Sequence, residues 1–213
     1  MPGRRGAAAP FGRATIGAVP RPTAIHFTGD EEADRLLARE PLALLIGFAL
    51  DQQVPVQTAF AGPLKLQQRL GTLDAAAIAA TDPERLEAAF RERPAIHRFP
   101  GAMARRVQEL CAQVSDEYSG DAARVWQGAA DGADLRARIG ALPGFGPMKI
   151  TALGSVLAKR FGVAAAQDLV PGHPTLGDVD SPQALAEYQA QKRAHKAARR
   201  AAAEAGGGAA PRV

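Results

Sequence analysis

The chain contains the stretch Leu142-Pro143-Gly144-Phe145-Gly146 between two segments with helical spacing of apolar residues. Gly144 and Gly146 permit positive φ angles and let the backbone approach a ligand closely, and Phe145 between them can anchor the turn in a core. Pro147 then favours the first turn of a helix, where free backbone amides point outward at the positive end of the helix dipole. Such a turn suits a phosphate and reads no base sequence. A plain corner between two helices explains the same glycines by geometry alone.

The composition indicates a helical protein. Of 213 residues, 46% are hydrophobic but only 5% are aromatic, and alanine dominates, which favours helices over a β-sandwich or barrel. No apolar run approaches the ~18 residues of a membrane span. Pro10, Gly12 and Arg13 interrupt the stretch where a signal peptide would need its apolar segment. We therefore expect an all-α fold and a cytoplasmic protein with no membrane partner.

The charges and the cysteine count narrow the partners and cofactors. The chain has 26 basic and 22 acidic residues, an excess that permits a polyanionic partner without demanding one. The single cysteine, Cys111, excludes an internal disulfide and a cluster held by four cysteines of one chain. Cys111 falls on an apolar helical stripe, which predicts a buried side chain. The four histidines are far apart in the sequence, and we expect no catalytic metal.

The chain divides into one domain and two terminal segments. Residues 1–22 are rich in Ala, Gly, Pro and Arg without apolar periodicity, which indicates a disordered basic arm or an incorrectly assigned start. A helical domain is predicted over residues 23–204. Residues 205–213, where a run of glycines begins, form a predicted flexible tail.

Apolar periodicity and caps predict the individual helices. One apolar stripe begins at Leu42, ends with Gln53 and is stopped by Pro55. A helix over 56–70 is expected to be interrupted at Gly62-Pro63. The other predicted helices are two short ones capped by Asp74 and Asp82, an amphipathic one from Pro100 to Gly120, short ones around Trp126 and Leu135–Ile139, one over 147–161, and a basic one from Ser181-Pro182. Residues 162–180 are expected to be irregular.

Three stretches together resemble the helix–hairpin–helix–GPD superfamily of base-excision DNA glycosylases, the endonuclease III-like group. They are LPGFGPMK at the hairpin, LLIGFALDQQ before Pro55, and PAIHRFPGAMARRVQEL in the amphipathic helix. The resemblance spans roughly residues 30–170 and is greatest to a compact actinobacterial subgroup. It implies two helical lobes around a cleft and places Gln53 where relatives insert a side chain into the duplex. With one cysteine, the iron–sulfur cluster of many relatives is expected to be absent, and no other cofactor is implied.

The resemblance also implies which residues do the chemistry. Relatives with lyase activity carry a nucleophilic lysine two residues after the second hairpin glycine, and here that position is Met148. A glycosylase without lyase activity is therefore expected. Lys149 follows one step later, rotated by ~100° about the helix axis. Three roles are open for it: a contact to phosphate, replacement of the nucleophile, or a solvated surface lysine. By its distance from the hairpin, Asp168 is the candidate catalytic carboxylate. Alternatives are Asp178 or Asp180, or no catalytic aspartate at all.

The remaining candidates are predicted to bind DNA. They are Gln52, Gln53, Gly144, Phe145, Gly146, Lys149, His97 and Arg98. Asp51 with the two glutamines can line a base pocket, because amides and carboxylates read base edges, or can cap a helix end. His97 is explained equally by local hydrogen bonding. The basic residues over 192–200 are either phosphate contacts or a solvated face.

Two main hypotheses for the function follow. The first is a monomeric, nucleoid-associated enzyme that binds duplex DNA, inserts Gln53 and hydrolyses the N-glycosidic bond of a damaged or mismatched base with the help of Asp168. The second is a non-catalytic helix–hairpin–helix protein that binds DNA but has lost the chemistry. A third class, a helical interaction protein without nucleic acid, predicts no salt-dependent binding to duplex DNA.

Overall fold

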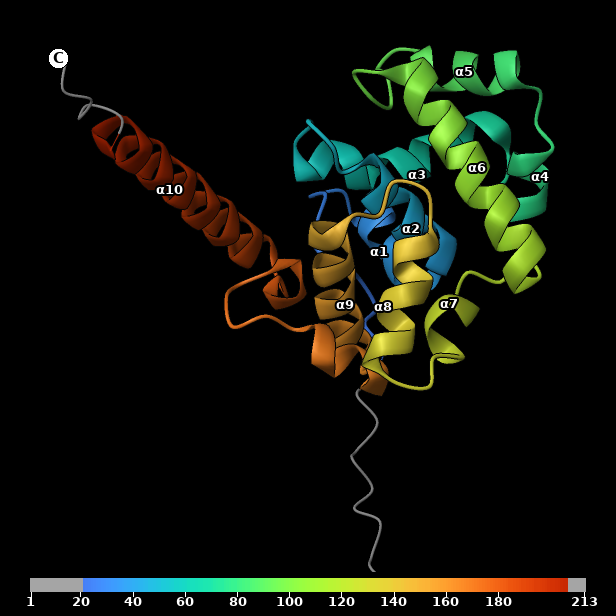
Figure 1. Cartoon of the computed structure of the whole chain (residues 1–213). Helices are drawn as coiled ribbons and strands as arrows, with labels where there is room; N and C mark the ends of the chain where they lie inside the picture. Colours follow the sequence, from blue (N-terminus) through green and yellow to red (C-terminus); the bar gives the residue numbers. More distant parts are fainter. Residues whose placement is uncertain (1–20, 207–213) are drawn as a thin grey trace, which may run out of the picture.

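The computed structural model describes residues 21–206, and all regular elements in that part of the chain are helical (Figure 1). The predicted all-α class is confirmed. The elements are α1 (Glu31–Arg39), α2 (Pro41–Leu50), α3 (Val56–Leu70), α4 (Ala75–Ala79), α5 (Pro83–Arg91), α6 (Pro100–Tyr118), α7 (Arg124–Gln127), α8 (Gly132–Ala141), α9 (Pro147–Phe161), the 3-10 helices η1 (Ala164–Leu169) and η2 (Leu176–Asp178), and α10 (Pro182–Gly206). None of the described helices combines the length and the apolar character needed to cross a bilayer.

The predicted terminal segments lie mostly outside the description. Residues 1–20, which make up nearly all of the expected arm, and residues 207–213 of the expected tail are outside the described residues. The last helix continues to Gly206, two residues beyond the predicted domain boundary at 204.

Helix α2 occupies the centre of the fold. Its nine residues from Leu42 to Leu50 are all buried, because both faces of this helix are apolar and are covered by neighbours. It packs against α1, α3 and α6. A Cβ on Gly47 would lie 2.5 Å from a ring carbon of Phe60, so the absence of a side chain at Gly47 sets the close approach of α3. Phe60 in turn meets the rings of Phe27 and Phe48 edge-on.

Local sequence signals placed most helix ends correctly. Asp74 and Asp82 accept hydrogen bonds from backbone amides at the starts of α4 and α5, as their capping positions predicted. Helix α6 buries the predicted apolar stripe, in which Cys111 is fully buried and burial raises its thiol pKa to about 12. Helices α9 and α10 begin at the predicted Pro147 and Pro182.

Two local predictions are wrong. Helix α3 is not interrupted at Gly62-Pro63 but runs through both residues. The contacts of α3 outweigh the hydrogen bond that Pro63 removes, and Gly62 lies so close to Leu50 that a Cβ there would approach its δ-carbon to 2.5 Å. The stripe of α2 does not extend to Gln53 either. Helix α2 ends at Leu50, and Gln53 is exposed in the following loop with a φ of 58°.

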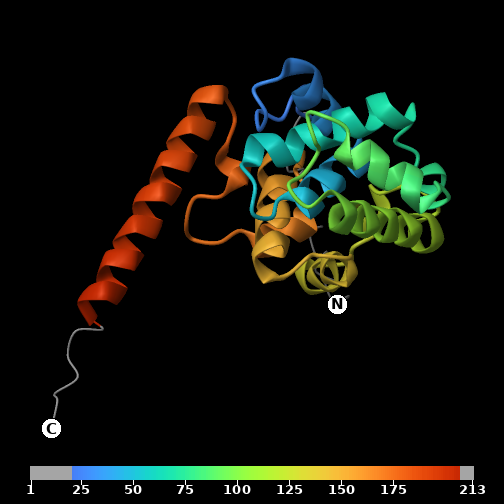
Figure 2. The same ribbon diagram turned by 90° about the horizontal axis from the view of Figure 1, so that it is seen from above.

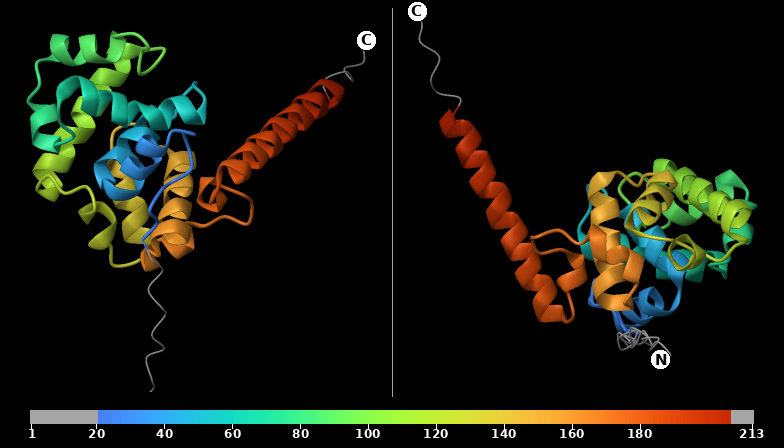
Figure 3. Two further views of the ribbon diagram at one scale, coloured as in Figure 1. Left: turned by 180° about the vertical axis from the view of Figure 1, so that it is seen from behind. Right: turned by 60° about the horizontal axis from the view of Figure 1, so that its bottom comes forward.

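Two arrangements outside the core set up the site. Helices α8 and α9 lie side by side and are joined by the hairpin, while α10 projects from the body of the protein (Figures 1, 2 and 3). The first part of α10 is attached to the core: Leu185 is buried, and the side-chain amide of Gln189 donates a hydrogen bond to Oε1 of Gln57 at 2.9 Å. The predicted irregular stretch after α9 contains η1 and η2, which both pack on α9.

The close approach of α2 and α3 is testable at Gly47. We expect Gly47→Ala to destabilise the protein by about 1–3 kcal/mol, because the added methyl overpacks the buried Phe60 contact. Gly140→Ala is the matched helical control, since its methyl would meet only the terminal methyl of Ile150, at 3.3 Å. The control should be neutral or stabilising by up to about 1 kcal/mol. Chemical denaturation measures both, and equal unfolding free energies for the two variants would contradict the packing argument.

Candidate nucleic-acid interface

The hairpin between α8 and α9 presents free backbone amides. Gly144 has a φ of 82°, which favours glycine, while Leu142 and Phe145 are buried and hold the turn against the core. In the described chain, the amides of Gly144, Gly146 and Met148 donate to no other protein group. These three donors lie at the positive end of the α9 dipole, so the hairpin carries a set of donors suited to an anion.

Arg106 of α6 joins the hairpin to the loop that follows α2. A Cβ on Gly144 would lie 2.7 Å from Cδ of Arg106, so the side chain of Arg106 crosses directly over the glycine. Its guanidinium donates to Oε1 of Gln52 at 2.5 Å. Two features therefore favour glycine at position 144: the positive φ angle, and the side chain of Arg106 that lies directly against it. The contact brings a fixed positive charge beside the free amides.

The loop over residues 51–55 presents Gln53. Its positive φ is rare for a residue other than glycine and costs about 1–2 kcal/mol. His97 holds this loop in place: Nδ1 accepts from the amide of Phe99 at 3.1 Å, so Nε2 carries the proton and donates to the carbonyl of Gln52 at 2.9 Å. Gln53 is therefore exposed, while the backbone of the preceding residue is fixed by the hydrogen bond from His97.

His97 and Arg98, both predicted to bind DNA, have different surroundings. His97 is only 2% exposed, both of its ring nitrogens bind protein groups, and burial lowers its pKa. Its placement gives it a positioning role for the loop. Arg98 is exposed, with its guanidinium carbon 4.7 Å from the centre of the Phe99 ring, and its charge remains available to a phosphate.

Lys149 is not a solvated lysine. It lies half-buried in the first turn of α9, and its Nζ donates to the carbonyl of Ala49 at 3.0 Å, in the last turn of α2. Burial lowers the pKa of Lys149 to about 8, and the charge of Arg106 acts in the same direction, whereas Asp51 opposes the shift. The preceding residue, Met148, points away from the core and is 87% exposed.

Asp51 is the acidic residue that the fold brings to Lys149. It follows directly after α2, it is half-buried, and its carboxylate forms no hydrogen bond or ion pair with the described part of the chain. Burial raises the pKa of Asp51, while Lys192 and Lys149 act to lower it. Helix α10 contributes Lys192 and also Tyr188, whose pKa burial raises. The sequence showed Asp51 beside two glutamines but not that α9 and α10 would bring cations to it.

Asp168 lies away from the hairpin. It is exposed in η1, and a Cβ on Gly132 would lie 2.7 Å from Cβ of Asp168. Gly132 begins α8 and the hairpin follows its other end, so a helix about 15 Å long separates Asp168 from the free amides. The structure does not bring the predicted catalytic carboxylate together with Lys149.

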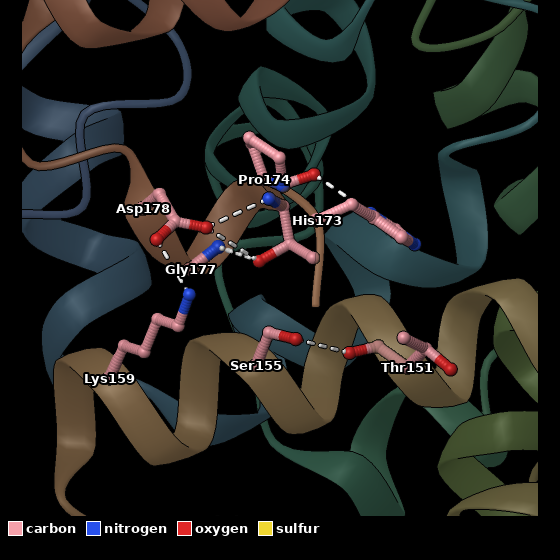
Figure 4. Close-up of polar contacts among 8 residues, drawn as sticks. Thr151, Ser155, Lys159, His173, Pro174, Gly177 and Asp178 are labelled. Atoms are coloured by element: carbon pink, nitrogen blue, oxygen red, sulfur yellow. Dashed lines mark hydrogen bonds and ion pairs between the residues drawn. The ribbon is translucent and has the colours of Figure 1, made fainter. Parts of the chain in front are cut away.

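Asp178 is occupied by contacts within the fold (Figure 4). One carboxylate oxygen binds Nζ of Lys159 at 2.6 Å, and the other accepts from the amide and the hydroxyl of Thr175 at 2.8 and 3.1 Å. Burial acts to raise the pKa of Asp178, but these bonds together outweigh it and lower that pKa below its usual value. They fasten η2 to α9, so Asp178 has a structural role. Asp180 is exposed immediately before α10.

Neither a search for metal-binding clusters nor comparison with known proteins assigns a further role to these residues. Among the side chains that the structure describes, no three of His, Cys, Asp or Glu gather in a way that could hold a metal ion. Comparisons with protein-family models, with curated proteins and with solved structures gave no match. The interpretation of the site therefore depends on its own geometry.

The role of His97 is testable by pH. Its folded pKa lies below the unfolded value of about 6.5, so the unfolded chain binds the proton more readily and stability falls as the pH drops through that value. We expect His97→Gln to lose this dependence between about pH 7.5 and 5.5. Denaturation curves of both proteins across that range measure it. An equal pH dependence in the variant would show that His97 is not buried in its neutral form.

Proposed function

We propose that this protein is a base-excision DNA glycosylase of the helix–hairpin–helix–GPD type, with two helical lobes around a cleft. The observation that supports this most is the hairpin itself, where three free amides lie next to the charge of Arg106 and close to a half-buried lysine. In this proposal the protein acts as a monomer on duplex DNA and associates with the nucleoid. It hydrolyses the N-glycosidic bond of a damaged or mismatched base.

The hairpin is the proposed phosphate anchor. Amides at a helix start bind an anion without reading sequence, and phosphate contacts of this kind fix the register of a protein on the duplex. Arg106 adds a charge that does not need to be ordered on binding, because Gln52 already holds it. The exposed Arg98 extends the same positive surface.

Gln53 is the proposed wedge. An enzyme that acts on a base must extrude the nucleotide from the stack and fill the gap it leaves. Gln53 has the required exposure, and its backbone is held in a strained conformation by the bonds of Gln52 to His97 and Arg106. Strain of this kind concentrates at functional sites.

The anchor is testable without disturbing the fold at Gly146. This residue has an ordinary φ, and a Cβ on it would meet nothing within 4 Å, so Gly146→Val should fold normally yet obstruct the outward amides. We expect duplex DNA to bind about tenfold or more weakly, because the variant loses about one hydrogen bond between a backbone amide and a charged phosphate. Gly172→Val, at another exposed glycine with open surroundings, is the control. Fluorescence anisotropy with a labelled duplex measures both, and unchanged affinity in Gly146→Val would remove the hairpin from the interface.

Lys149 supports a second candidate activity, strand cleavage through an imine. A lysine with a pKa of about 8 is partly unprotonated near neutral pH and can attack an aldehydic sugar carbon. The exposed Met148 at the position of the family lysine favours the enzyme without lyase activity. Borohydride added during reaction with a lesion-bearing duplex distinguishes the two. We expect no trapped adduct, whereas an adduct that disappears in Lys149→Ala would establish the lyase.

A binding module without chemistry is the alternative. Duplexes carrying uracil, oxidised, alkylated or mismatched bases would then bind in a salt-dependent way without release of any base. An absence of salt-dependent binding altogether would leave only the third class, a helical interaction protein.

A further inference from the structure

We infer that Asp51 is the catalytic carboxylate of this site and accepts a proton from the water that replaces the excised base. The inference depends on the proposed glycosylase function and names a residue that the hairpin pattern does not identify. It is carried by the position of an unoccupied carboxylate between the last turn of α2, Lys149 of α9 and Lys192 of α10.

The backbone of Asp51 is fixed. Its amide donates to the carbonyl of Gly47 at 3.0 Å, and the neighbouring carbonyl of Ala49 accepts from Nζ of Lys149. Gln52, the next residue, is held by His97 and Arg106. A carboxylate on such a fixed support is preorganised, which proton transfer in a transition state requires.

The described groups leave the carboxylate of Asp51 open. None of them donates a hydrogen bond to it, and no described cation lies within ion-pair distance of it. Asp168 and Asp178 differ in this respect, because both oxygens of Asp178 are occupied and Asp168 lies at the far end of α8. Of Asp51, Asp168 and Asp178, only Asp51 is both available and near the hairpin.

The groups that face Asp51 suit a proton acceptor. Lys192 and Lys149 favour its ionised form, and Tyr188 is a further titratable neighbour among the described side chains of α10. Burial acts in the opposite direction and raises the pKa of Asp51, which makes its carboxylate a stronger base than a solvated one. A general base works best with its pKa moved toward the operating pH.

The reaction step balances without any further reagent. The bond from C1′ of the sugar to the base nitrogen breaks, and its electron pair leaves with the base, which takes a proton from solvent. The oxygen of a water forms the new bond to C1′ and gives one proton to Asp51. Asp51 then returns this proton to solvent, so the products are the free base and a sugar hydroxyl.

Single-turnover base release tests the assignment, with the lesion duplex that the wild-type protein processes. We expect Asp51→Asn to lower the rate by about 100-fold or more, within the usual contribution of a general base, with duplex affinity little changed. Asp51→Glu should recover part of the rate. Asp168→Asn is the matched control and should remain near the wild-type rate. Unfolding cannot explain the loss, because replacing a half-buried carboxylate by a neutral amide should preserve or raise stability.

A second measurement uses the charge on α10. Removing Lys192 withdraws a charge that lowers the pKa of Asp51, so Lys192→Ala should move the acidic limb of the pH–rate profile to higher pH. Arg193→Ala removes a charge from the next residue of the helix and is the control for weaker DNA binding. With the protein in saturating excess, only Lys192→Ala should shift the limb.

The outcomes separate the inference from the proposed function. Base release that survives Asp51→Asn but is lost in Asp168→Asn would overturn the assignment and leave the glycosylase in place. An acidic limb that moves equally in both α10 variants would also contradict it. Failure of the wild-type protein to release a base from any of the tested lesions would overturn the glycosylase and the assignment together.

Discussion

The hydrogen bond from Lys149 to the carbonyl of Ala49 links the end of α2 to the start of α9, and the arrangement of the site follows from it. Helix α2 is buried from Leu42 to Leu50, and the carbonyls of its last turn lack the hydrogen-bond partners that a continuing helix would give them. A side chain must supply the donor, and Lys149 does so from the helix that carries the hairpin. The free amides of the hairpin are thereby held at a fixed position relative to the loop that presents Gln53.

The sequence predicts those features of the fold that are decided within a few residues. The caps at Asp74 and Asp82 and the helix that begins at Pro147 were located because the amide, side chain and ring involved are neighbours in the chain. The sequence does not show that α3 continues through Pro63, because the stability of α3 comes from its contacts with α2 and not from its own propensity. Gln53 continues the apolar spacing of α2, but spacing does not show that the helix ends at Leu50.

The candidate site likewise has some features that the local sequence predicts and others that only distant contacts create. The hairpin could be found from Gly144 and Gly146, because a turn of this kind needs glycine wherever it occurs. Lys149 and its acceptor are 100 residues apart, so nothing local marked that lysine as half-buried. The spacing from the hairpin predicts an aspartate after α9, at Asp168. Spacing alone does not give the direction of η1, and η1 turns the side chain of Asp168 toward Gly132. For Asp51, the sequence supplied the residue and two open roles, and the fold supplied the cations.

The order Met148-Lys149 at the start of α9 has a physical consequence for the proposed chemistry. A step along a helix rotates a side chain by ~100°, which turns Met148 outward and Lys149 inward to the end of α2. An inward lysine in direct contact with Asp51 would form an ion pair and occupy the carboxylate. Because Lys149 spends a hydrogen bond on Ala49 instead, it acts on Asp51 only through its charge. The charge of Lys149 therefore favours the ionised carboxylate without occupying its oxygens, and an ionised carboxylate with an open oxygen can take a proton from water.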